Sequence, residues 1–306
     1  METREHEPVK EYEGRQAIIK LEFFRHDEKA KSTAGGDRTG DEFIRLTPAG
    51  REHATQIGKT KKPNVKTAVA FSSERERATE TSLRHMLSNE DEITKDMSLE
   101  DIRSKIGEQM TVGKKNKTIR QLNFDWDSNP EFAKVAYPRY TESKDALFFL
   151  KDESDELVRK LKDQVSDSYS RSAGDFAELT KKYIKILPRW KKILAEKRED
   201  YSQTNNEMQR FFGTHQTVPE PFLMKIIEKT QGSEKVEDFI KSLKTANGFE
   251  PSQGYSVIIT DKDNKPSISL VFEGKEVLVT TEILDEIIAE RDALNKEIAF
   301  ELDNDK

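Results

Sequence analysis

The chain has 306 residues, and its 52 lysines and arginines against 58 aspartates and glutamates give a formal net charge of −6. No run of about 18 apolar residues occurs, so the sequence predicts no membrane-spanning helix and no membrane partner. Cysteine is absent, which excludes disulfides, thiolate metal sites and cysteine nucleophiles. Basic and acidic residues are interleaved in a mildly acidic chain, which argues against a nucleic-acid partner.

The N-terminal part of the chain contains a polar segment and then a strand. Residues 1–16 are charged and polar without an apolar stretch, so we expect a frayed end, no secretory signal and a cytoplasmic location. Residues 17–24 form an apolar run that is typical of a buried strand, and Arg25 and His26 follow it. A loop rich in Gly, Ser and Thr extends from residue 30 to about 41.

A second strand is expected between two helices. The first helix should run from residue 47 to about 58, because Thr47 can cap its free amides and Pro48 suits the first helical position. Residues 65–71 are typical of a buried strand, and the second helix is expected at about 74–87.

The middle of the chain is predicted to be loop and helix. A short strand is expected at 92–94, and residues 103–145 lack periodicity, which indicates loop with short helices. From about 144 to 197 the pattern is helical, with apolar residues three and four apart in a continuous seam. Pro188 lies inside this seam and is expected to kink or split the helix.

The C-terminal third begins with a third buried strand at 208–213, which Thr214 and His215 follow. Helices are expected at about 219–229 and 233–245. Three further strands and a closing amphipathic helix complete the chain, at 255–260, 267–272, 276–279 and about 283–298.

Strands that alternate with helices favour an α/β sheet with both faces covered. We therefore predict a three-layer α/β/α sandwich with a mostly parallel sheet, plus a helical insertion and C-terminal strands and a helix. In such sheets the chemistry lies at the carboxyl ends of the strands. Three polar pairs occupy that position in the sequence: Arg25–His26, Ser72–Ser73 and Thr214–His215.

The two histidines at strand ends are the strongest candidates for chemistry. An imidazole is well suited to act as a nucleophile or to carry a proton near neutral pH. Arg25 precedes the first histidine, and Arg77 lies one helical turn past Ser73. A guanidinium matches phosphate oxygens in geometry, so His26, His215, Arg25 and Arg77 together would form a phosphate pocket.

Each of these residues also has a structural interpretation when it is taken alone. A histidine at a strand end is more often structural, and a single arginine is more often a surface charge. The joint placement is what favours a site. His53 and His85 fall inside helices without a partner pattern, and we interpret them as structural.

Four segments of the chain, in order, resemble the motifs of the histidine phosphatase superfamily, which has the phosphoglycerate mutase-like fold. They resemble the Arg-His pair, the Leu-Thr-x-x-Gly-x-x-x-Ala segment, the Ser-Ser-Pro-Leu-x-Arg-Ala-x-x-Thr segment and the second histidine, at residues 23–29, 46–54, 72–81 and 212–219. The chain departs from the family pattern at Asp27, where Gly or Ala is usual, and at Glu74 and Arg75, which replace Pro-Leu.

The resemblance implies a single catalytic domain over residues 1–306, with a loop-rich and helical insertion at about 103–205. It further implies that His26 attacks phosphorus and becomes phosphohistidine, while Arg25, Arg77 and His215 bind the phosphoryl oxygens. No cofactor and no metal are implied, because the arginines supply the positive charge. The expected partner is a phosphorylated small molecule or phosphopeptide, and the oligomeric state stays open.

The family also has an acid that protonates the leaving oxygen, in a Leu-x-Glu context. Residues 96–102 fit this context and put Asp101 in the acid's position, with neighbouring Glu100 as a competitor. Both carboxylates could instead be solvated. The predicted function is a metal-independent phosphatase of phosphomonoesters. The alternatives are a phosphoglycerate-type mutase and a catalytically weak protein that binds phosphate and a partner.

Overall fold

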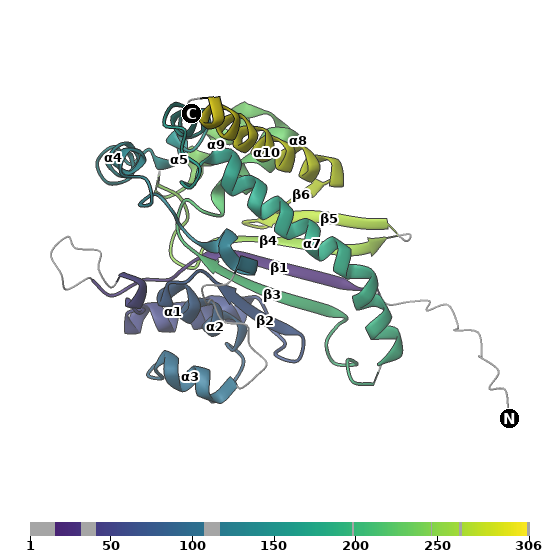
Figure 1. The fold of residues 1–306 in the computed structure, drawn as a ribbon. Coiled ribbons are helices and arrows are strands. Elements are labelled where there is room, and N and C mark those ends of the chain that lie inside the picture. Colours follow the sequence, from purple (N-terminus) through teal and green to yellow (C-terminus); the bar gives the residue numbers. More distant parts are fainter. Residues whose placement is uncertain are drawn as a thin grey trace.

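A six-stranded sheet forms the centre of the computed structural model, with strand order β2-β3-β1-β4-β5-β6 (Figure 1). The structure describes residues 16–31, 41–106, 117–197, 199–245, 247–262 and 265–304. The strands are β1 (Ile18–Arg25), β2 (Ala68–Ser72), β3 (Glu207–Thr214), β4 (Gly254–Lys262), β5 (Lys265–Phe272) and β6 (Lys275–Val279).

The sheet is mostly but not entirely parallel. Strand β3 pairs in parallel with both β1 and β2, whereas β4 is antiparallel to β1, β5 to β4 and β6 to β5. Strands β1, β2, β3 and β5 therefore run in one direction, and β4 and β6 run in the other. The predicted parallel core and C-terminal strands are confirmed.

Helices cover both faces of the sheet, so the predicted three-layer fold is also confirmed (Figure 1). Helices α1 and α2 lie on one face, and α7 and α8 lie on the other, with α10 packed along α7. The helices are α1 (Pro48–Thr60), α2 (Glu76–Met86), α3 (Leu99–Ile106), α4 (Pro130–Pro138), α5 (Ala146–Phe149), α6 (Asp152–Lys160), α7 (Tyr169–Glu196), α8 (Glu220–Gln231), α9 (Ser233–Ser242) and α10 (Thr281–Asn304).

The carboxyl-terminal part of strand β1 is buried on both sides, because successive side chains point to opposite, covered faces. The Phe23 ring lies 5.0 Å from the ring of Phe176 in α7 and 4.8 Å from that of Phe212 in β3. The next residue, Phe24, faces the other layer, with its ring centroid 4.1 Å from that of His85 in α2. Burial on both faces fixes the position and direction of β1, which ends where the candidate site begins.

Helix α1 begins as predicted and packs against the end of β1. The Thr47 side chain accepts a hydrogen bond from the backbone N–H of Gly50 at 2.9 Å, as expected of an N-cap. A Cβ atom on Gly50 would lie 2.4 Å from the carbonyl oxygen of Glu28. The lack of a side chain at Gly50 therefore allows the first turn of α1 to approach the segment that follows His26.

The prediction of a strand at 92–94 is wrong. These residues form a turn between α2 and α3. Two carbonyls of the segment bind the buried guanidinium of Arg84, with Nη1 3.2 Å from Thr94 O and Nη2 2.8 Å from Met97 O. The backbone groups bind this arginine instead of a neighbouring strand.

The helical segment at 144–197 is broken into several helices. A kink or a split was expected at Pro188, and the split does not occur there. The segment comprises α5, α6 and α7, and Pro188 lies inside the unsplit α7. Trp190 is buried beyond the proline and donates from Nε1 to Asn206 O at 2.9 Å, so tertiary packing holds the helix together there. The chain breaks instead before α7, where the Asp163 carboxylate accepts from the backbone N–H of Val165 at 2.8 Å.

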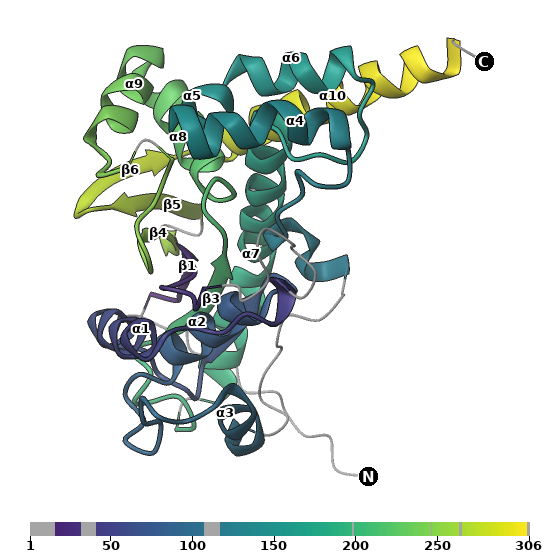
Figure 2. The same ribbon diagram turned by 90° about the vertical axis from the view of Figure 1, so that its left-hand side faces the viewer.

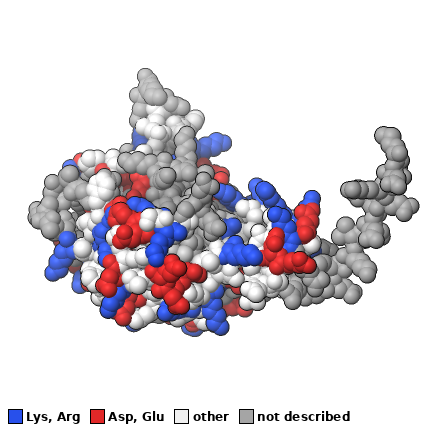
Figure 3. Space-filling model, turned by 90° about the horizontal axis from the view of Figure 1, so that it is seen from below, with Lys and Arg blue, Asp and Glu red and all other residues white. Residues whose placement is uncertain are grey.

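Helices α4, α5 and α6 lie together near α8 and α10 (Figure 2). Residues 103–145 contain short helices where the structure describes them, and 107–116 lie outside the described residues. In the face drawn in Figure 3, Lys and Arg side chains alternate with Asp and Glu. No helix among the described residues is both long enough and apolar enough to span a membrane.

Candidate active site

The carboxyl ends of β1, β3 and β2 lie side by side at one edge of the sheet. Ser72 pairs with Gly213 in the ladder. The pairing continues past the strands, since His26 N donates to Thr214 O at 2.8 Å and Ser73 N donates to Gly213 O at 3.1 Å. The three polar pairs at the strand ends therefore meet at this edge.

His26 is buried, and its ring is held in one orientation. Nδ1 lies 2.7 Å from the carbonyl oxygen of Asp27, and Nε2 accepts a hydrogen bond from Arg77 Nε at 3.2 Å. Because a carbonyl only accepts and a guanidinium only donates, the proton of the neutral ring is on Nδ1. Burial lowers the pKa of His26 well below its usual value, and the charges of Arg77, Arg25 and Lys29 lower it further. His26 is therefore neutral at pH 7, with a lone pair on Nε2.

His215 lies beside His26, with ring centroids 5.2 Å apart in an edge-to-face arrangement. Its Nε2 is 2.8 Å from Ser73 Oγ, so the residue after β2 orients the histidine after β3. Burial lowers the pKa of His215 well below its usual value, and the nearby Arg77, His26 and Arg75 act in the same direction. Both imidazoles are therefore neutral hydrogen-bonding groups at neutral pH.

Arg77 is the buried cation of the site. Besides its bond to His26, it donates from Nη1 to Asp41 O at 2.7 Å and from Nη2 to Asp41 Oδ2 at 2.9 Å. Burial, with a smaller contribution from Arg75, lowers the pKa of Arg77 to about 9, so the guanidinium stays charged at neutral pH. Arg75 also pairs with the Asp41 carboxylate, which places it at the edge of the same pocket.

Arg25 is anchored by one of its nitrogens. Nη1 donates to the carbonyl oxygen of Phe249 at 2.6 Å, whereas the buried Nε has no hydrogen-bond partner among the described residues. The backbone N–H of Phe249 in turn donates to Glu220 Oε1 at 2.8 Å. Glu220 is fully buried, and this burial raises its pKa to about 7. Arg25 therefore keeps an unused donor while its position is fixed.

The structure does not bring Asp101 into this cluster. Its carboxylate accepts from Ser98 N at 3.1 Å and Ser98 Oγ at 2.7 Å at the start of α3, and these bonds lower the pKa of Asp101. Glu100 pairs with Arg45, which also pairs with Glu76 at 2.6 Å. The first turn of α3 is thus linked to the first turn of α2, the helix that carries the buried arginine of the site. No hydrogen bond or ion pair in the described part of the chain joins Asp101 to either histidine.

Two polar residues near the arginines were missed by sequence reasoning. The sequence before Asp41 has no periodic pattern, so only the fold shows that its carboxylate meets Arg77. Tyr140 donates to Gln216 Oε1 at 2.6 Å, and burial raises its pKa while the charges of Arg25 and Arg77 oppose that rise. Gln216 could have been noticed as the neighbour of a strand-end histidine, but nothing in the sequence pairs it with a tyrosine 76 residues away.

Within the described ranges between residues 16 and 304, no group of three or more His, Asp or Glu side chains is arranged to hold a metal ion. The guanidiniums of Arg77 and Arg25 lie at this edge of the sheet.

No protein-family model matches the sequence, and a comparison with curated proteins finds no match. Solved structures similar to this chain include a phosphoglycerate mutase from Bacillus anthracis, at 16% identity and a TM-score of 0.40, over 89% of this chain and 97% of that one. Mycobacterial hydrolase 2 is 12% identical, with a TM-score of 0.42, over 90% and 98%. A mycobacterial glucosyl-3-phosphoglycerate phosphatase is 10% identical, with a TM-score of 0.35, over 80% and 91%.

The TM-scores of these structures lie below 0.5 and their identities below 25%. The function proposed below therefore depends on the residues of the site.

Proposed function

We propose that the protein is a metal-independent phosphatase that hydrolyses phosphomonoesters through a phosphohistidine on His26. The state of His26 carries this proposal. Its Nδ1–H is held by a backbone carbonyl, so the lone pair is on Nε2, beside His215. In the structure this lone pair accepts a hydrogen bond from Arg77 Nε, which an incoming phosphoryl group has to replace. A buried, neutral and oriented imidazole is the reactive form of a histidine nucleophile.

The proposed reaction has two steps. His26 Nε2 attacks phosphorus, the bond from phosphorus to the ester oxygen breaks, and the departing alcohol takes up a proton. Water then attacks phosphorus and gives up a proton to the group that protonated the alcohol. The bond from phosphorus to Nε2 breaks, and inorganic phosphate leaves with the neutral imidazole restored. Arg25, Arg77 and His215 bind the phosphoryl oxygens in both steps, and catalysis comes mainly from positioning and charge.

Substrate binding has to displace an internal anion. The Asp41 carboxylate accepts from Arg77 Nη2 at 2.9 Å, at a donor that a phosphoryl oxygen would use. A phosphoryl group offers more negative charge and three acceptor oxygens to the guanidinium fork, which favours the exchange.

Asp101 is the proposed donor of the proton to the leaving oxygen. Its support is the place after Leu99 in the family-like segment and the link from α3 through Arg45 to the start of α2. In the structure its carboxylate caps α3, so the role requires the Ser98 bonds to be exchanged for a substrate contact.

The proposed substrate is a phosphorylated small molecule or a phosphopeptide. Specificity would come from residues 103–145 and from the helices that follow, which lie outside the four family-like segments. A screen of phosphorylated metabolites and phosphopeptides, with release of inorganic phosphate as the signal, would define the class.

The test of the proposed function is the turnover of an aryl phosphate by the purified protein in the presence of a chelator. We expect steady release of phosphate by the wild type and a loss of several orders of magnitude in His26→Ala, since the covalent route is removed. Transfer to a second hydroxyl without phosphate release would favour the mutase, and phosphate binding without turnover would favour a binding protein.

A further inference from the structure

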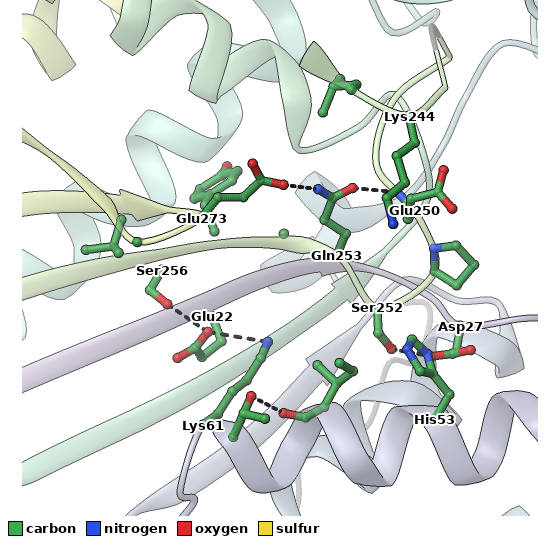
Figure 4. Close-up of a pocket in the computed structure, with 18 of the residues that line it drawn as sticks. Glu22, Asp27, His53, Lys61, Lys244, Glu250, Ser252, Gln253, Ser256 and Glu273 are labelled. Atoms are coloured by element: carbon green, nitrogen blue, oxygen red, sulfur yellow. Dashed lines mark hydrogen bonds and ion pairs between the residues drawn. The ribbon is translucent and has the colours of Figure 1, made fainter. Parts of the chain in front are cut away.

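Asp27, the residue after the proposed nucleophile, has a buried carboxylate at the wall of a large cleft. The cleft has a volume of about 1250 Å³, and Asp27, His53 and Ser252 are among the residues that line it (Figure 4). The Asp27 side chain is only 1% exposed. A carboxylate so deeply buried is costly unless hydrogen bonds replace its water.

Three donors from different parts of the chain bind this carboxylate. Oδ1 accepts from the backbone N–H of Glu28 at 2.7 Å, and Oδ2 accepts from Ser252 Oγ at 2.5 Å. Oδ2 also accepts from Nδ1 of His53 in α1 at 2.7 Å, and Figure 4 shows His53 and Ser252 converging on it. The buried His85 also has a partner, since its Nε2 lies 3.0 Å from Ser252 Oγ. The positions of His53 and His85 in the sequence indicated neither of these contacts.

The backbone of Asp27 is fixed as well. Its N–H donates to Thr81 Oγ1 in α2 at 2.9 Å, and its carbonyl oxygen accepts the Nδ1–H of His26 at 2.7 Å. Helix α1, helix α2 and the loop before β4 thus hold one residue at the point where it orients the nucleophile. Ser252 adopts a left-handed backbone conformation, with φ of +57°, in the turn that delivers its hydroxyl.

We propose that Asp27 is a positioning residue for His26, and that His53 and Ser252 act through it. Their bonds to the carboxylate hold the Asp27 peptide, so its carbonyl keeps the ring proton of His26 on Nδ1 and leaves Nε2 as the attacking atom. An imidazole in the other tautomer would have no lone pair on the attacking side. This inference rests on the proposed role of His26 as nucleophile.

The experiment compares two pairs of variants with one control. Asp27→Ala removes the acceptor, and Asp27→Asn keeps the size and one acceptor oxygen. His53→Ala removes a donor at a side chain that is 47% exposed, and His53→Asn restores an N–H near the position of Nδ1. The control is Glu22→Gln, a change at another buried carboxylate of the same cleft, which pairs with Lys20 at 2.8 Å and has no bond to the site.

Two quantities are measured: the tautomer of His26, by ¹⁵N NMR of the imidazole nitrogens, and kcat and KM for an aryl phosphate. For Asp27→Ala and His53→Ala we expect a mixture of His26 tautomers and a decrease in kcat of about tenfold, with KM nearly unchanged, as for other partners that orient a functional imidazole. His53→Asn should restore both towards the wild type, and Glu22→Gln should change neither.

The inference is overturned if His26 keeps its tautomer and kcat in His53→Ala, or if Glu22→Gln causes the same losses. The His53 pair keeps the test decisive even if Asp27→Ala does not fold. A shift of tautomer in a protein that never turns over phosphate would reject the proposed function while it supports the positioning role. Normal turnover that depends on His26 but not on Asp27 or His53 would support the proposed function and reject the positioning role.

Discussion

At the residue scale, the guanidinium of Arg77 joins the nucleophile to the phosphate pocket. Its Nε donates to His26, while its two terminal nitrogens bind Asp41. A lysine in its place would supply charge without the planar fork, so the two functions depend on the shape of the group as well as on its charge.

Arg77→Lys should therefore lower kcat/KM of an aryl phosphate by about 10²-fold or more, the loss typical of removing a preorganised donor to developing charge. Arg159→Lys is the matched control, because that arginine is exposed and pairs with Glu297 far from the site. Steady-state kinetics of both variants measure the effect. Equal activity in the two variants would contradict the role of Arg77.

The proton donor is tested by its dependence on the leaving group. An alkyl oxygen leaves poorly without a proton, whereas a nitrophenolate leaves almost unaided. We expect Asp101→Asn to slow alkyl phosphates far more than nitrophenyl phosphate, and Glu100→Gln to slow both alike. The selective effect in Glu100→Gln would show that the assignment is displaced by one residue. A selective effect in neither variant would place the donor elsewhere.

The sequence predicted the residues of the pocket where each follows a buried strand or begins the next helix, as His26, Ser73 and His215 do. Such positions can be found because strand periodicity and turn chemistry are local. Asp41 and Glu220 could not be found in this way. Their roles depend on contacts between residues that are far apart in the sequence. Asp41 accepts from Arg77, and Glu220 accepts from the backbone N–H of Phe249.

At the element scale, α2 carries Arg77 to the site and buries His85 in the layer below the sheet. Burial lowers the pKa of His85 well below 6.5, and the charges of Lys61 and His53 contribute. The unfolded chain binds a proton at this residue below about pH 6.5, while the folded chain does not. The stability that neutral His85 contributes is therefore complete above pH 6.5 and is lost as the pH falls towards the folded pKa.

His85→Gln should remove this pH dependence. Each unit of pH below about 6.5 costs about 1.4 kcal/mol for one such histidine, so the fall in unfolding free energy between pH 7.5 and 5.5 should shrink by about that amount in the variant. Urea unfolding at the two pH values measures it. The variant is expected to be less stable at both pH values, so the decisive quantity is the difference in unfolding free energy between pH 7.5 and 5.5. If this difference is the same in the variant and the wild type, His85 is protonated in the folded protein.

Element boundaries were predictable where a local signal marks them, such as the Thr47 cap of α1. A strand was expected at 92–94 and a kink or split at Pro188. The strand and the split are wrong, because tertiary contacts decide both. Arg84 binds the carbonyl of Thr94, and packing around Trp190 holds α7 together beyond Pro188.

At the scale of the whole molecule, the parallel strands bring two histidines and Arg25 to one edge of the sheet, and α2 brings Arg77 to the same place. The layers on both faces keep water from the imidazoles, which are buried. The same layers hold Asp27 from three directions, so the fold as a whole fixes the orientation of the nucleophile. We propose that residues 103–145 and the helices that follow distinguish one phosphate ester from another, because they lie outside the family-like segments.

The most direct test of the central claim is the covalent intermediate itself. The protein is mixed with a phosphomonoester, denatured in alkali, digested and mapped by mass spectrometry, with His215→Ala included to slow the second step. We predict an alkali-stable, acid-labile phosphate on the peptide that contains His26, and none in His26→Ala. Phosphate on Ser73, or turnover by His26→Ala at the wild-type rate, would contradict the account.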